Sequence, residues 1–234
     1  MNIYDINGVI IDTNNDPLVS ISMIESLGII GDSYASGEIY NQSTEQLEDH
    51  YQLSWGEVIG RMCGINVDIY AAGGLTSKTW LTDSYGLAKM NNAEPNNLYL
   101  IALGINDSSR LTLGTVSDIE SDSNDTFYSY YGRIIRAVRS HAPNAIIILS
   151  TIALYAEKHN TFSAAIRNIG SHYDLSVIDL ADNSFFKSQF FTDNKIMYHP
   201  TALNYSAMGK EYKKLIEDVL QKDISKYGQY FGLT

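Results

Sequence analysis

Cysteine is almost absent from this sequence of 234 residues: Cys63 is the only one, so no disulfide can form within the chain. Basic residues are missing from its beginning, where the first Lys or Arg is Arg61, whereas a secretory signal needs a basic segment before its apolar run. No apolar stretch approaches the roughly 18 residues of a membrane span. The sequence therefore predicts a soluble chain of unknown localisation. A cytosolic protein fits, and so does a module of an extracellular or virion protein that does without disulfides.

Positive charge is scarce along the whole chain. Sixteen Lys and Arg stand against 27 Asp and Glu, which gives a formal net charge of −11 and a pI near 4.7. Such an acidic surface repels phosphate backbones and anionic membranes. We therefore expect no nucleic-acid and no membrane partner, while the oligomeric state stays open.

Cofactor and metal motifs are also missing. The Gly-rich turns lack the Lys of a phosphate-cradling loop, and GxGxxG does not occur. The histidines show neither HExxH nor another metal-ligand spacing. They are His50, His141, His159, His172 and His199. The sequence predicts no cofactor and no metal.

What the sequence does contain is a core of ordinary size, because 44% of its residues are hydrophobic. Five apolar runs of strand length alternate with segments of helical periodicity, which predicts parallel strands in an α/β three-layer sandwich. The strands are expected at Ser26–Ile30, Val67–Ala71, Leu98–Leu103, Ala145–Leu149 and Ser176–Leu180. The helices are expected at Trp55–Met62, Phe127–Ser140, Ser163–Tyr173 and Ser206–Lys222.

The chain shows neither an internal repeat nor a linker that would divide it. We expect a polar N-terminal lead-in over residues 1–17 and a single domain over residues 18–234. The acidic stretch from Ser108 to Asp125 is expected to be a solvated loop rather than a lid over a site.

Four short polar groups follow elements of this predicted fold. Ser33 comes after the first strand, Gly74 after the second and Asn106 after the third, and His199 precedes the last helix. In open α/β sheets, ligands bind beyond the carboxyl ends of the strands, so these groups should converge on one rim. Each alone is an ordinary turn or cap, but four in this order are hard to explain that way.

The residue types suit nucleophilic catalysis on an ester. A serine hydroxyl needs a base to take its proton, and His199 is the obvious base for Ser33. Attack on a carbonyl creates an oxyanion, which the backbone N–H groups of Ser33 and Gly74 and the amide of Asn106 could bind.

The four groups read GDSYASG, AAGGLT, GIND and YHP, and in this order they resemble the blocks of the SGNH (GDSL-type) hydrolase superfamily. The resemblance runs from Ile29 to about Gly209. It implies a flavodoxin-like α/β/α fold with a parallel five-stranded sheet. It also implies Ser33 as nucleophile, His199 as base, and Ser33, Gly74 and Asn106 as oxyanion donors. The family hydrolyses esters of lipids, aryl alcohols and acetylated carbohydrates.

One position departs from the family, which has Asp three residues before its His where this chain has Ile196. That Asp normally orients the imidazole and stabilises the imidazolium. Asp193 could replace it, a backbone carbonyl near Ile196 could do so in a Ser–His dyad, or nothing does. We favour the dyad.

These features predict a serine esterase that removes small acyl groups, acetyl foremost, from a carbohydrate. Aromatic side chains suit sugar rings, and the tyrosines expected near the rim are Tyr34, Tyr40, Tyr155 and Tyr198. The alternative is a catalytically weak carbohydrate-binding or adsorption module of a larger surface or phage tail protein. A lipase or thioesterase stays open, although no long apolar lid is visible.

Overall fold

A parallel sheet of five strands forms the centre of the molecule. The structure, a computed structural model, describes residues 3–4, 10–11, 19–153 and 157–232. The sheet strands run in the order β6-β3-β7-β8-β9, and every neighbouring pair is parallel. They are β3 (Ser26–Gly31), β6 (Asn66–Ala71), β7 (Leu98–Ala102), β8 (Ile146–Ser150) and β9 (Ser176–Ile178). Counted along the chain this is the order 2-1-3-4-5, which is that of flavodoxin-like folds.

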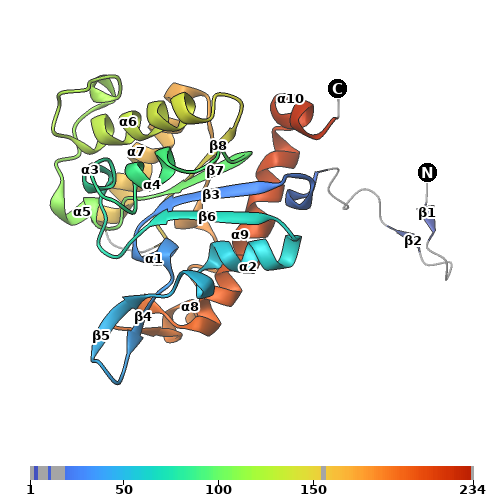
Figure 1. The fold of residues 1–234 in the computed structure, drawn as a ribbon, viewed down its shortest axis with the longest axis horizontal. Helices are drawn as coiled ribbons and strands as arrows, with labels where there is room; N and C mark the ends of the chain where they lie inside the picture. The colour runs from blue at the N-terminus through green and yellow to red at the C-terminus, as the bar shows by residue number, and fades with distance from the viewer. Residues whose placement is uncertain (1–2, 5–9, 12–18, 154–156, 233–234) are drawn as a thin grey trace.

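Helices cover both faces of the sheet, as Figure 1 shows. α2 (Trp55–Cys63) and α9 (Ala202–Lys222) pack on one face, where Trp55 stacks on Tyr212 with ring centroids 4.0 Å apart. α6 (Phe127–His141) and α7 (Glu157–Tyr173) pack on the other. The central strands β3, β7 and β8 are buried on both sides, which explains why their sequences are mainly apolar runs.

Shorter helices, 3₁₀ turns and strand pairs lie outside the five-stranded sheet and its four long helices. The remaining helices are α1 (Ser33–Ser36), α3 (Ser77–Trp80), α4 (Leu87–Asn91), α5 (Asp107–Arg110), α8 (Gln189–Asp193) and α10 (Ile224–Tyr227). Single 3₁₀ turns lie at Ile21–Met23, Tyr51–Leu53, Val116–Asp118, Leu180–Asp182 and Gly228–Phe231. Among the described residues, three antiparallel pairs lie outside the main sheet: β1 (Ile3–Tyr4) with β2 (Ile10–Ile11), β4 (Glu38–Asn41) with β5 (Gln46–Asp49), and β10 (Lys195–Ile196) with β11 (His199–Pro200).

The predicted α/β sandwich and its five parallel strands are confirmed. The third helix is longer than expected, because α7 begins at Glu157 rather than Ser163. Its first turns bury Phe162 and His159 against the core, and Glu157 lies at the N-terminus, where a carboxylate is favourable.

Most residues of the stretch Ser108–Asp125 are exposed, as predicted for a solvated loop, although the stretch includes the end of α5 and one 3₁₀ turn. Ile119 is fully buried, and Arg136 of α6 binds Glu120 and Asp122 with N–O distances of 3.1 and 2.6 Å. These contacts join the segment to α6, while the side chains of Glu120 and Asp122 stay 55% and 80% exposed.

Most of the expected lead-in, residues 1–17, lies outside the described residues, as does Tyr155. The extent of the single domain thus stays a prediction. Among the helices that are described, none is long and apolar enough to cross a membrane.

Candidate active site

Ser33 lies where β3 gives way to α1. Asp32 caps this short helix, and its carboxylate accepts the Tyr34 N–H at 3.1 Å. A Cβ on Gly31 would lie 2.4 Å from that of Ala35, so only glycine lets α1 fold back so closely on the strand. This sharp turn leaves Ser33 at the carboxyl end of the sheet with 5% of its surface exposed.

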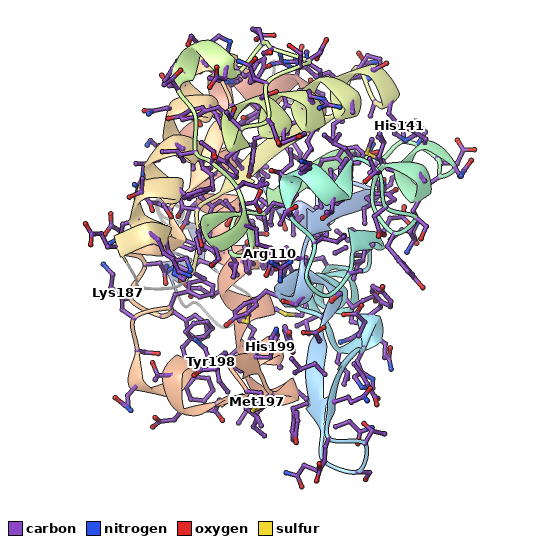
Figure 2. The ribbon with its side chains drawn as sticks, turned by 90° about the vertical axis from the view of Figure 1, so that its left-hand side faces the viewer. Arg110, His141, Lys187, Met197, Tyr198 and His199 are labelled. Carbon is purple, nitrogen blue, oxygen red and sulfur yellow. The ribbon has the colours of Figure 1, made fainter. Side chains whose placement is uncertain are left out.

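His199 contacts Ser33 from a β-hairpin whose turn has two residues. Met197 and Tyr198 join β10 to β11, and both have positive φ, 50° and 66°, as a type I′ turn requires. The Tyr34 hydroxyl donates to the Tyr198 carbonyl at 2.7 Å and so holds the turn against α1. Figure 2 shows Met197, Tyr198 and His199 close together, with Arg110 above them in this view.

The two ring nitrogens of His199 have different partners. Nδ1 lies 2.9 Å from the Met197 carbonyl, and Nε2 lies 3.1 Å from Ser33 Oγ. Because a carbonyl can only accept, Nδ1 carries the hydrogen of the neutral ring. Nε2 then presents its lone pair to the serine, which is the arrangement a general base needs.

Asp193 is placed away from this arrangement. It ends α8, and its carboxylate accepts from the Gln189 amide at 2.6 Å. Ile196 pairs with His199 across the hairpin. Of the alternatives considered for Nδ1, the backbone carbonyl is the one that contacts it in the described residues.

Gly74 and Asn106 lie in the loops after β6 and β7. Gly74 has a φ of 78°, a value that favours glycine, and its carbonyl accepts from Arg110 at 2.6 Å. The Asn106 amide donates to the Leu75 carbonyl at 3.0 Å, which leaves its second N–H for a ligand. The buried Asp107 accepts from the Ser77 N–H at 2.8 Å, and this bond ties the two loops together.

A family model matches residues 29–207 of this chain, a span that contains all four groups. It describes the GDSL-like lipase/acylhydrolase family. The chain belongs to this family. It is accordingly a carboxylic ester hydrolase, and the predicted superfamily is confirmed.

Solved structures share the fold of this chain. A lipase candidate from Chitinophaga pinensis is 17% identical, with 89% of this chain and 99% of that one covered and a TM-score of 0.59. A family two carbohydrate esterase from Cellvibrio japonicus is 18% identical over 84% of this chain and 61% of its own, with a TM-score of 0.62. The corresponding enzyme with a carbohydrate-binding domain from Corynascus thermopiles (Myceliophthora fergusii) is 17% identical over 92% and 70%, with a TM-score of 0.60. Among curated protein sequences, none matches significantly.

This GDSL-like chain has a site rich in carboxyl groups. Burial raises the pKa of Asp32 to about 7, and one of its carboxyl oxygens has no hydrogen-bond partner among the described residues. Burial likewise raises the pKa of Asp107 to about 6. Burial lowers the pKa of His199, but hydrogen bonds to Glu38 and to the Met197 carbonyl outweigh it, so the net shift is upward.

Sequence reasoning missed Glu38, whose Oε2 lies 2.8 Å from Nε2 of His199. It also missed Asp49, which accepts from the Ser36 hydroxyl and from the Gly73 N–H. Glu38 follows GDSYASG directly, which is the only signal that could have pointed to it. Among the described residues, no cluster of three or more His, Cys, Asp or Glu could hold a metal ion.

Proposed function

We propose that this GDSL-like hydrolase is a serine esterase that removes small acyl groups, acetyl foremost, from carbohydrates through a Ser33–His199 dyad. The observation that carries the proposal is the pair of contacts on His199, with Ser33 Oγ on Nε2 and the Met197 carbonyl on Nδ1. The first supplies a base for the nucleophile, and the second fixes the tautomer that can act as that base.

The reaction follows from these positions. His199 Nε2 takes the Ser33 proton while Oγ attacks the ester carbonyl, and the carbonyl electron pair moves onto its oxygen. The N–H groups of Ser33 and Gly74 and the free N–H of Asn106 bind that oxyanion. The imidazolium then protonates the leaving alcohol as the acyl C–O bond breaks, which leaves the acyl group on Ser33 Oγ. In the second half, His199 Nε2 takes a proton from water while the water oxygen attacks the acyl carbon. The bond to Ser33 Oγ then breaks, Oγ takes the proton back from His199, and the carboxylic acid is released.

An exposed aromatic side chain next to the base supports a carbohydrate as the substrate. Tyr198 is 87% exposed next to the base, and an exposed aromatic ring suits the apolar face of a sugar. Tyr34 is buried and supports the turn instead. The family two carbohydrate esterases among the solved structures favour the same substrate class.

One observation favours a second candidate, a hydrolase of more apolar esters. Met197 and Ile196 are exposed beside Tyr198, so the tip of the hairpin is apolar. Longer acyl chains could lie against such a tip.

Acetate release from an acetylated polysaccharide tests the proposal. Wild type should release acetate, and Ser33→Ala should be slower by at least about 1,000-fold. Ser43→Ala, on an exposed turn of the neighbouring hairpin, should match wild type.

Two outcomes would favour another function. A rate that rises from p-nitrophenyl acetate to p-nitrophenyl octanoate, with no acetate from the polysaccharide, would favour the second candidate. Binding of the polysaccharide without turnover, equal in wild type and Ser33→Ala, would favour an adsorption module.

A further inference from the structure

A carboxylate lies on the reactive side of the base. Glu38 Oε2 is 2.8 Å from Nε2 of His199, the same nitrogen that faces Ser33 Oγ at 3.1 Å. The other ring nitrogen has only a neutral partner, the Met197 carbonyl. The negative charge nearest to the imidazole in the described part of the chain therefore comes from an element that the four sequence blocks do not include.

The backbone holds Glu38 firmly in this position. Gly37, with a φ of 75°, ends α1 and turns the chain directly into β4. The Tyr205 hydroxyl of α9 donates to the carbonyls of both Ser33 and Glu38, at 3.2 and 2.9 Å. The backbones of Ser33 and Glu38 are thus fixed to the same hydroxyl.

The side chain is confined as well. Its exposed fraction is 13%. A Cβ on Gly73 would lie 2.0 Å from Glu38 Oε1, so the glycine leaves the space that the carboxylate fills. One oxygen lies against the loop after β6, and the other faces the imidazole.

This geometry favours the charged form of the ring. When the Ser33 proton moves to Nε2, the ring becomes an imidazolium, and a carboxylate at contact distance stabilises it. Before the transfer Nε2 has no hydrogen to donate to Glu38. The interaction is thus stronger during the reaction than before it, which is the condition for accelerating a step.

We propose that Glu38 is the charge partner of His199, a positioning residue that stabilises the imidazolium from the Nε2 side where Ile196 leaves no carboxylate on the Nδ1 side. The inference rests on the proposed esterase function. The proton travels from Ser33 to Nε2 and then to the leaving oxygen as the acyl C–O bond breaks. Glu38 acts through its charge and carries no proton between these groups.

Other charged groups near His199 are farther away or already bound. Asp32 acts on the ring through its charge without contacting it. Asp49 is bound by the Ser36 hydroxyl and the Gly73 N–H. On the hairpin itself, Lys195 has its ammonium 3.8 Å from the centre of the Phe191 ring. Tyr34 lies beside the imidazole with its hydroxyl bound to Tyr198.

The test compares Glu38→Gln with Glu45→Gln, which removes the same charge from the exposed turn of the same β4–β5 hairpin. NMR titration gives the pKa of His199, whose ring signals are assigned by their loss in His199→Asn. Glu38→Gln should lower that pKa by about one pH unit or more. The acid limb of kcat/KM for p-nitrophenyl acetate should move down with it, and the plateau should fall about 10- to 100-fold. Glu45→Gln should change neither quantity, and Glu38→Asp should recover part of the loss.

Two results would overturn the inference. A higher plateau in Glu38→Gln would mean that Glu38 competes with Ser33 for the base and inhibits it. An unchanged His199 pKa would mean that the carboxylate only fills space. The activity and the His199 titration are also measured in Ser33→Ala. Full activity in Ser33→Ala would mean that the proposed esterase function fails. An unchanged His199 pKa in Glu38→Gln would mean that the Glu38 proposal fails, whatever the activity of Ser33→Ala. Far-UV circular dichroism verifies that each variant is folded.

Discussion

At the scale of single residues, the side chains around Ser33 divide the catalytic work between charge and hydrogen bonding. Asn106 is an example of the hydrogen-bonding role. One N–H of its amide donates to the Leu75 carbonyl, and the other N–H is left for an oxyanion. The bond to Leu75 fixes the direction of the free N–H before any substrate arrives, which is what makes such a donor effective.

Removing that donor should slow the chemical step. Asn106→Ala is expected to lower kcat by about 100- to 1,000-fold with little change in KM, since the oxyanion forms only during the reaction. Steady-state kinetics on p-nitrophenyl acetate measure this. Asn92→Ala, an exposed amide at the end of α4, serves as the control. A kcat within twofold of wild type would remove Asn106 from the oxyanion site.

Asp32 should make the stability of the protein depend on pH. Burial raises its pKa from 3.8 to about 7, so the folded chain prefers the protonated carboxyl. Its favourable contribution is complete below about pH 4 and disappears as the pH rises through about 7. Relative to Asp32→Asn, the free energy of unfolding of wild type should therefore fall by up to about 4 kcal/mol across that window.

Urea denaturation at a series of pH values measures this difference. Asp193→Asn, which changes an exposed carboxyl, is the control for the substitution itself. A constant difference between wild type and Asp32→Asn would show that Asp32 is ionised in the folded protein throughout.

At the scale of elements, the β10–β11 hairpin carries the base His199, and the two residues of its turn are of types that this turn conformation disfavours. Type I′ turns favour Asn and Gly, because both central residues have positive φ, yet Met197 and Tyr198 occupy them here. Non-glycine residues in this conformation cost roughly 1 kcal/mol or more each. The Tyr34 hydroxyl bond to the Tyr198 carbonyl helps to hold the strained turn.

Relieving this strain should stabilise the protein. Met197→Asn is expected to raise Tm by about 2–4 °C, since Asn tolerates positive φ and the carbonyl that contacts His199 is retained. Met197→Val should lower Tm, because a branched side chain is least compatible with this conformation. Differential scanning calorimetry of the two variants decides the point, and equal Tm values would contradict the assigned turn.

The same hairpin shows where sequence reasoning stops. The five sheet strands could be predicted, because burial on both faces leaves long apolar runs. The β10–β11 pair could not, since Lys195–Ile196 and His199–Pro200 are too short for any alternation and the turn lacks Asn-Gly. Glu38 was missed for the same reason: β4 has no apolar pattern, and a side chain acquires its partner only from the tertiary fold.

At the scale of the whole molecule, the sheet order brings distant sequence blocks to one rim. β3 lies between β6 and β7, so the loops with Ser33, Gly74 and Asn106 follow neighbouring strands. Could the fourth block also be placed from sequence? The place of His199 in the order of the blocks predicted that it lies at the same rim. Its position in space, however, depends on how α9 packs against α2.

That packing depends on Gly209. A Cβ there would lie 2.6 Å from the Val58 Cβ and 2.9 Å from the Trp55 carbonyl. Gly→Ala usually stabilises a helix by about 1 kcal/mol, but here the clash should prevail and destabilise the protein by about 1–3 kcal/mol. Thermal unfolding measures this, with Ser206→Ala as a control on the same helix.

Val58→Ala should restore only part of the stability lost in Gly209→Ala, since it removes the Val58 Cγ1 that the new methyl meets at 2.6 Å but keeps the Val58 Cβ and the Trp55 carbonyl. If Gly209→Ala were instead as stable as wild type, α9 would lie farther from α2 than the structure places it.

The central claim is that Ser33 is a nucleophile activated by His199. The most direct measurement is the initial rate of p-nitrophenyl acetate hydrolysis by wild type, Ser33→Ala and His199→Ala between pH 6 and pH 9. We predict that the wild-type rate rises with pH as His199 loses its proton, and that each substitution lowers the rate by at least about 1,000-fold. Rates in Ser33→Ala equal to those of wild type would contradict the account.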